Sequence, residues 1–135
     1  MPSKLPSTAR GACAATGPAP GEARVRFRLR VTEGDAIAIG PGKIALLEAV
    51  GRTGSITAAA KSLDMSYRRA WLLLDELNRS LRVAAVDSTK GGAAHGGSEL
   101  TDAGRELIAL YRRIEQTAMQ ACSDDIRRML GMLAS

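Results

Sequence analysis

Aromatic side chains, cysteine and histidine are scarce in this chain of 135 residues: aromatics make up 3% of it, and there are two cysteines and one histidine. Cys13 and Cys122 lie far apart in unlike surroundings, which indicates neither a disulfide framework nor a zinc site. No apolar run approaches the ~18 residues that a membrane span needs, and the amino terminus lacks the apolar stretch of a secretory signal. These absences favour one cytoplasmic domain with appendages and no contact with membranes.

Positive charge is in excess and unevenly spread. The formal net charge is +5. Residues 1–32 carry six lysines and arginines against one acid, residues 43–90 carry eight against five, and residues 91–135 carry five against six. The basic excess therefore lies in the first two thirds of the chain, where it favours a polyanionic partner, although many basic proteins bind none.

The amino-terminal third predicts a tail and then two strands. Residues 1–23 are rich in Pro, Ala, Gly, Ser and Thr without periodicity, which is typical of a disordered tail. Residues 24–32 alternate between polar and apolar, which predicts a strand with four arginines on one face. Its apolar face holds Val25, Phe27, Leu29 and Val31. The arginines either protect an edge strand from intermolecular pairing or contact phosphates. After a turn, residues 36–39 predict a short second strand.

Three helices are predicted after these strands. The first begins at Pro41, whose missing N–H costs nothing in a first turn, and ends at residues 53–54. Ser55 and Ser66 are expected to cap the second and third helices. The third helix carries a continuous apolar stripe made of Ala70, Leu73, Leu74, Leu77 and Leu81. Two such helices joined by a short turn predict a helix-turn-helix over residues 55–81.

A hairpin and a long helix complete the pattern. Residues 83–89 are β-prone, and a glycine-rich loop over residues 90–98 precedes the return strand. Thr101 is expected to cap the last long helix, whose apolar positions keep helical spacing. Ser123 followed by two acids is typical of a new helix start. We therefore expect a break there and a short helix to Leu133.

Three features favour a DNA-binding role for residues 55–81. The first of its two helices is rich in alanine, so that the second can cross it closely. The second helix begins with a cap, which is followed by Tyr67, Arg68 and Arg69. In a recognition helix, the residues near the N-terminus are the ones that reach base edges. A glycine-rich hairpin follows directly, which is the order of a winged helix.

The residue types suit this position. Arginine offers a planar fork of donors that matches O6 and N7 of guanine. We expect Arg68 or Arg69 to read a base while the other holds a phosphate, against the alternative of a solvated helix face. Tyr67 can donate to a phosphate or touch a thymine methyl group. Trp71 packs either on the sugar–phosphate edge or against the wing.

Hydroxyl groups and the wing are candidates for further contacts. Ser55, Thr57 and Ser66 lie at helix starts, where backbone N–H groups favour anions. Lys90 and His95 are the basic residues of the wing, against the alternative that the wing is a mobile hairpin tip. Because His95 stands alone among glycines, we predict neither a metal site nor a cofactor.

Four short runs point to a known family. They are Gly-Ser-Ile-Thr-Ala-Ala-Ala at residues 54–60, Met-Ser-Tyr-Arg-Arg-Ala-Trp at 65–71, Asp-Glu-Leu-Asn at 75–78 and Thr-Lys-Gly-Gly at 89–92. Together they resemble the amino-terminal domain of the ModE family of molybdate-responsive transcription regulators, over residues 24–119. The first run is shared with LysR-type regulators, whereas the second, with its glycine-rich wing, is more specific.

The resemblance implies an α+β fold: a winged helix-turn-helix with an N-terminal strand and a long C-terminal helix, both used to form a dimer on a two-fold operator. It also implies DNA contacts at the start of the recognition helix, by Ser66, Tyr67, Arg68, Arg69 and Trp71. We accordingly divide the chain into a disordered tail (1–23), a DNA-binding domain (24–102) and a helical dimerisation segment (103–135).

The chain departs from the family's pattern in three places. Asp64 stands where many relatives have glycine, in a left-handed turn that Asp tolerates less well. The wing has Ala93, Ala94 and His95 where relatives have lysine and more glycine. Full-length relatives continue into a molybdate-binding region of small β-barrels, whereas residues 116–135 are helical in pattern. We therefore expect no molybdate binding by this chain, which would act unliganded or with a separate oxyanion-binding protein.

The preferred hypothesis is a dimeric, sequence-specific transcription regulator that binds duplex DNA and is linked to molybdenum or related oxyanion metabolism. The alternative is a winged-helix module that docks a protein instead of DNA. An enzyme is disfavoured, because no nucleophile–base pair is present and the glycine-rich loop lacks the ending of a phosphate-binding loop.

Overall fold

The computed structural model describes residues 21–91 and 97–134. Their helices and strands are β1 (Val31–Glu33), β2 (Ala36–Ile39), α1 (Pro41–Thr53), α2 (Ile56–Ser62), α3 (Tyr67–Ser80), β3 (Val86–Gly91), β4 (Gly97–Leu100), α4 (Asp102–Ala121) and α5 (Ser123–Gly131). The chain divides into two compact units, of which Phe27–Ala121 contains every element from β1 to α4, and the other contains α5. Three helices followed by a hairpin and a long helix form the predicted winged helix-turn-helix.

β1 and β2 form an antiparallel hairpin that turns at Gly34, where φ is +61°. The strand predicted over residues 24–32 is wrong except at its end, because residues 24–30 pair with no strand in the described part of the chain. A strand needs a neighbour to bond its N–H and C=O groups, and the four residues of β2 pair with Val31–Glu33. The second predicted strand, residues 36–39, is confirmed.

Local signals mark the starts of α2 and α3 and the end of α1. The Oγ of Ser55 accepts a hydrogen bond from the N–H of Ala58 at 2.9 Å, and the Oγ of Ser66 accepts one from the N–H of Arg69 at 3.1 Å. α1 ends at Gly54, whose φ of +76° is the left-handed conformation that glycine adopts without strain. The predicted caps are therefore confirmed.

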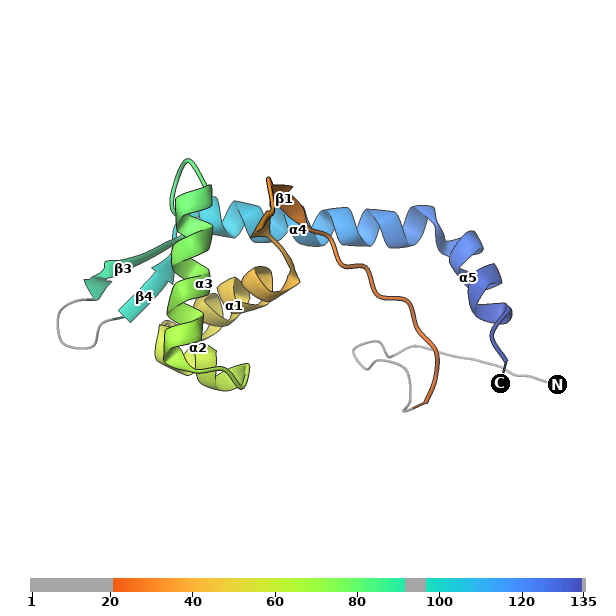
Figure 1. Ribbon diagram of the computed structural model, residues 1–135, viewed down its shortest axis with the longest axis horizontal. Helices are drawn as coiled ribbons and strands as arrows, with labels where there is room; N and C mark the ends of the chain where they lie inside the picture. Colours follow the sequence, from red (N-terminus) through yellow and green to blue (C-terminus); the bar gives the residue numbers. More distant parts are fainter. Residues whose placement is uncertain (1–20, 92–96, 135) are drawn as a thin grey trace. The chain divides into compact units, whose positions relative to one another are not determined.

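α1, α2 and α3 enclose one apolar core, and α3 crosses α1 (Figure 1). The largest fully buried side chains are Ile44, Leu46, Leu47, Val50 and Leu77. The predicted stripe of α3 faces this core: Ala70 and Leu74 are buried with Leu77, while Leu73 and Leu81 are half-buried against it. The helical periodicity of α3 thus predicts its buried face correctly.

The turn between α2 and α3 contains a left-handed residue, Asp64, with a φ of +56°. This conformation costs an ordinary L-residue ~1–2 kcal/mol, and Asp is among the residues that tolerate it best. The carbonyl oxygen of Ala60 secures the turn by accepting hydrogen bonds from the N–H groups of Leu63 and Met65, both at 3.0 Å. The turn therefore keeps a glycine-like shape with Asp in the glycine position.

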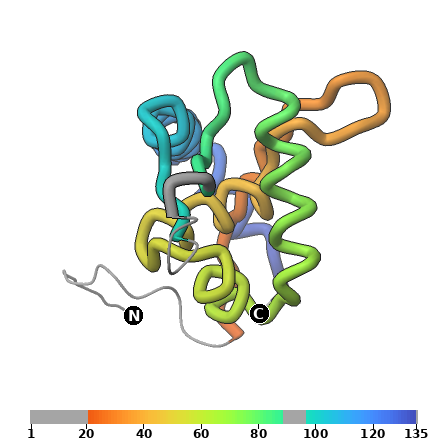
Figure 2. The backbone as a smooth tube through the Cα atoms, turned by 90° about the vertical axis from the view of Figure 1, so that its left-hand side faces the viewer, coloured from red at the N-terminus to blue at the C-terminus, as the bar shows by residue number. Residues whose placement is uncertain are grey.

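The wing, β3 with β4, is attached to the helices at both of its ends. The N–H of Ser98 donates to the carbonyl of Gly54 at 3.0 Å, which joins β4 to the end of α1. Thr101 caps α4 as predicted: its Oγ1 accepts from the N–H of Gly104 at 3.1 Å and donates to the carbonyl of Ala84 at 2.6 Å. Figure 2 shows the β1–β2 hairpin on the side of α3 opposite to the wing.

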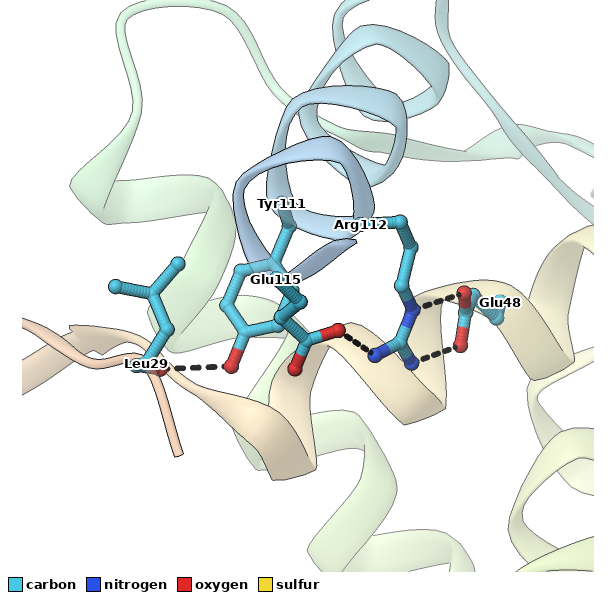
Figure 3. A network of polar contacts seen from close by, with 5 residues as sticks. All are labelled: Leu29, Glu48, Tyr111, Arg112 and Glu115. Carbon is cyan, nitrogen blue, oxygen red and sulfur yellow. Dashed lines mark hydrogen bonds and ion pairs between the residues drawn. The ribbon is translucent and has the colours of Figure 1, made fainter. Parts of the chain in front are cut away.

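A polar network joins α4 to α1 and to the segment before β1 (Figure 3). Both oxygens of Glu48 accept hydrogen bonds from the guanidinium of Arg112, at 2.7 and 2.9 Å, and Glu115 accepts a third at 2.6 Å. The hydrogen bonds from Arg112 lower the pKa of the Glu48 carboxyl below its usual value. The hydroxyl of buried Tyr111 donates to the carbonyl of Leu29 at 2.7 Å, and burial raises the pKa of this phenol. Residue 29 is thereby held against α4 without belonging to a strand.

α5 follows α4 after a break at Cys122, as predicted, but its start differs in detail. Cys122 occupies the capping position without a side-chain hydrogen bond, and Ser123 is the first helical residue. The helix ends at Gly131, two residues before the predicted end. None of its residues is buried. No helix in the described ranges is both long and apolar enough to cross a membrane.

Candidate nucleic-acid interface

The first turn of α3 is the best-defined candidate surface. Ser66 caps it, α2 supports it through the small buried residues Ala59 and Ala60, and Ala70 faces them from α3. Small side chains let two helix backbones approach closely, so the exposed start of α3 is held on a rigid support. This arrangement is the one required of a helix that enters a DNA groove.

Arg68 and Arg69 are both exposed, and no ion pair involves either of them within the described residues. The acidic residues further along α3 are already engaged: Asp75 pairs with Arg79 at 3.0 Å and Glu76 pairs with Lys43 at 3.3 Å. The start of α3 therefore carries two unpaired cations next to the positive end of a helix dipole, which favours a polyanion there.

The two arginines border one small hollow together, and each also lines a hollow that the other does not. Arg68 lines a shallow hollow of about 330 Å³ together with Tyr67, Trp71 and Leu72. Arg69 lines a larger groove of about 740 Å³ between α3 and the β1–β2 hairpin, with other basic side chains: Arg28, Arg30, Lys43 and Arg79. Three acids, Glu33, Asp35 and Glu76, also line this groove, and Glu76 pairs with Lys43. The arrangement suits a division of roles, with Arg68 on the outward face of α3 and Arg69 beside a basic track.

Tyr67, Trp71 and Leu72 are the large exposed apolar or aromatic residues of α3, with exposed fractions of 54%, 45% and 42%. Sequence reasoning named Tyr67 and Trp71 but missed Leu72, because it searched for polar side chains that contact DNA. The signal was present in the helical spacing, since Leu72 lies off the stripe that contains Ala70, Leu73 and Leu74. No wing residue lines the hollow at Trp71 among those that the structure describes.

The other candidate DNA-contacting residues lie at helix starts and in the wing, and the structure does not describe all of them. Ser55 and Ser66 use their hydroxyl oxygens as caps, so each hydroxyl hydrogen remains available to a phosphate. Thr57 is exposed on α2. The backbone of Lys90 lies in β3, and nothing is described of its side chain. His95 lies outside the described residues.

Sequence comparison supports the family resemblance. Residues 42–105 match the family model described as bacterial regulatory helix-turn-helix protein, lysR family. The chain is 45% identical over 85 residues to the molybdenum-pterin-binding protein MopB of Rhodobacter capsulatus, covering 63% of this chain and 32% of the relative. It is 38% identical over 97 residues to the molybdenum transport protein ModE of Azotobacter vinelandii, covering 70% and 36%.

The DNA-binding transcriptional dual regulator ModE of Escherichia coli K12 is 38% identical over 88 residues, covering 63% of this chain and 34% of its own length. The chain thus spans about a third of the length of these relatives. A solved structure of a CbnR DNA-binding domain with DNA aligns with a TM-score of 0.49 and 27% identity, over 62% of this chain and 91% of that one. Over 63–70% of its length this chain is therefore similar in sequence to the ModE and MopB proteins, and its residues 42–105 match the LysR-type helix-turn-helix model.

Proposed function

We propose that this protein is a sequence-specific, DNA-binding transcription regulator of the ModE type. One observation carries the proposal: the capped start of α3, packed on α2, exposes Arg68 and Arg69 without ion-pair partners in the described part of the chain. A wing, β3 with β4, follows α3 in the sequence. The proposal is supported by the names of two relatives, the ModE proteins of Yersinia pestis and Escherichia coli, which describe them as transcriptional regulators. Residues 24–102 would form the DNA-binding domain and residues 103–135 the dimerisation segment.

In this mechanism α3 enters the major groove with its first turn leading. Arg68 makes a bidentate contact with a guanine, and Arg69 holds a phosphate beside it. Ser55, Thr57 and Ser66 donate to phosphates at the starts of α2 and α3. The wing, with Lys90 and His95, follows the backbone of the adjacent groove.

Replacing Arg68 with alanine should weaken binding to a selected duplex by ~1–3 kcal/mol and relax the preference at one base position. Replacing Arg69 with alanine should weaken binding to all duplexes alike. It should also make the slope of log K against log salt shallower by about 1, the change expected when one phosphate contact is lost. Fluorescence anisotropy at several salt concentrations, on a duplex selected from a random pool, measures both effects.

Arg82→Ala is the matched control, because Arg82 is an exposed arginine beyond the other end of α3. The fourteen residues of α3 place the two ends ~20 Å apart, so this variant should bind as the wild type does. Unchanged specific binding in both Arg68→Ala and Arg69→Ala would remove α3 from the interface. A flat salt response would favour the protein-docking alternative.

We also propose that the protein binds DNA as a homodimer. Large apolar side chains are exposed on α4 and on the segment before β1, namely Leu110, Ile114, Met119 and Phe27. Phe27, Leu29, Ile114 and Ala118 also line an open hollow of about 190 Å³. A two-fold partner would cover this apolar surface and would offer a strand to the unpaired residues 24–30.

Sedimentation at micromolar concentration should show a dimer, and Ile114→Asp should shift it to the monomer, because a carboxylate would have to be buried in the interface. Arg113→Asp, at the exposed neighbouring position, is the control and should leave the dimer intact. A wild-type monomer at this concentration would contradict the proposal.

The source of the regulatory signal is the last part of the proposal. The names of the relatives connect them with molybdenum. We propose that the protein is linked to molybdenum or related oxyanion metabolism, and that it acts either without a ligand or with a separate oxyanion-binding protein that carries the signal.

A further inference from the structure

We infer that α3 reads thymine methyl groups through an apolar shelf made of Tyr67, Trp71 and Leu72, next to the base that Arg68 reads. The inference rests on the proposed function and deepens it, since it names the class of DNA sequence that the same surface selects.

The shelf is a continuous feature of α3. Tyr67, Trp71 and Leu72 line one hollow together with Arg68. Tyr67 and Trp71 are one helical turn apart, as are Arg68 and Leu72, so the four side chains form two adjacent pairs on one surface. The guanidinium of Arg68 therefore shares its hollow with three large side chains that are largely apolar.

Packing within the protein does not explain these exposed side chains. The core side of α3 is occupied by Ala70, Leu74 and Leu77, which are buried. Leu72 lies two residues from both Ala70 and Leu74, on the outward side, where it also borders a second hollow beside Arg69. About half of the surface of each shelf side chain is in water (54%, 45% and 42% for Tyr67, Trp71 and Leu72), and burying that apolar surface against a partner would be favourable. The shelf is thus available to an apolar partner.

Charge and groove chemistry identify that partner. Unpaired Arg68 and Arg69 attract a polyanion to this surface, as described above, and the major groove of duplex DNA presents one apolar group on its base edges, the C5 methyl of thymine. A shelf beside a guanine-reading arginine therefore suits a site in which thymine lies next to the guanine. Contacts with deoxyribose C–H groups, the competing use of such a shelf, would carry no sequence preference.

Deoxyuridine tests the inference directly, because it lacks only the methyl group of thymine. Starting from a duplex selected by the full-length protein from a random pool, each thymine is replaced in turn by deoxyuridine and affinity is measured by anisotropy. At one or two positions in each half-site the replacement should weaken binding about four-fold, the factor expected for one buried methyl group. Elsewhere in the duplex it should have no effect.

Variants connect the effect to the shelf. In the wild-type protein, deoxyuridine replacement should lower the affinity about four-fold at these positions. In Leu72→Ala and Trp71→Ala the same replacement should leave the affinity almost unchanged. Val83→Ala, which truncates an exposed apolar residue beyond the end of α3, should retain the full loss. Circular dichroism melts confirm folding, and if Trp71→Ala were unfolded, Leu72→Ala alone would decide.

The outcomes are distinguishable. Salt-dependent binding with no deoxyuridine effect at any position would overturn the inference and leave the proposed function intact. A deoxyuridine effect that persists fully in both variants would assign methyl reading to other residues and also overturn it. Binding to no duplex at all would defeat the proposed function, and the inference with it.

Discussion

Replacing Gly104 with alanine is expected to destabilise the protein by ~3 kcal/mol, at the upper end of what a forced overpacking costs. A Cβ at this position would meet the backbone of Ala85, lying 3.1 Å from its carbonyl carbon and 3.3 Å from its Cα, and closer still to its oxygen. The carbonyl oxygen cannot move aside without loss, because it accepts the N–H of Thr101 at 2.9 Å. The higher helix propensity of alanine offsets ~1 kcal/mol of this cost at most.

Thermal unfolding followed by circular dichroism measures the effect, and a loss of this size lowers the melting temperature of a domain of about 100 residues by more than ~10 °C. Gly42→Ala is the matched control. Gly42 lies in α1, and a Cβ there would have no neighbour within 4 Å. It should leave stability unchanged or raise it slightly. Equal melting temperatures for the two variants would show that α4 does not pack on Ala85 as described.

Replacing Asn78 with alanine is expected to cost about as much, ~3 kcal/mol, through lost hydrogen bonds rather than a clash. The side-chain oxygen of Asn78 accepts the N–H groups of Ala85 and Val86, at 2.8 and 3.2 Å, and its Nδ2 donates to the carbonyl of Val86 at 3.2 Å. Both partners are buried. A buried backbone group left without a partner costs ~1–3 kcal/mol.

Urea unfolding gives the loss of stability, and amide hydrogen exchange should show faster exchange at Ala85 and Val86 in the variant. Arg79→Ala is the control on the neighbouring residue, whose exposed ion pair with Asp75 is worth ~0.2–1 kcal/mol. If Asn78→Ala were no more destabilising than Arg79→Ala, the side chain of Asn78 would not hold the loop after α3.

Local signals predicted much of the fold. Ser55, Ser66 and Thr101 cap helices as predicted, because an N-cap depends on a side chain and an N–H group three residues apart. The apolar stripe of α3 was predictable for a similar reason, since helical periodicity is read from neighbouring residues. The interface candidates on α3 follow from these two signals together.

Features that depend on distant partners were not predictable. The alternation over residues 24–32 predicts a strand, but whether a strand forms depends on a neighbour elsewhere in the chain or in a second copy. Asn78 was noted for its resemblance to a family, and its bonds to Ala85 and Val86 emerge only when the loop folds back. Leu72 was missed because the sequence shows that it is apolar but not that it is exposed, and only the exposure marks it as a candidate contact residue.

Three constraints meet at the loop after α3: Asn78 bonds the N–H of Ala85, Thr101 bonds the carbonyls of Ala84 and Ala85, and Gly104 lies against Ala85. This loop therefore sets the orientation of α4. The twenty residues of α4 extend ~30 Å from it, so a tilt of ~5° would move the far end of α4 by ~2–3 Å. In a dimer built on α4, the spacing between two operator half-sites would thus depend on the shape of this loop. Gly104 lets α4 approach the backbone of Ala85 in the loop more closely than any residue with a side chain could.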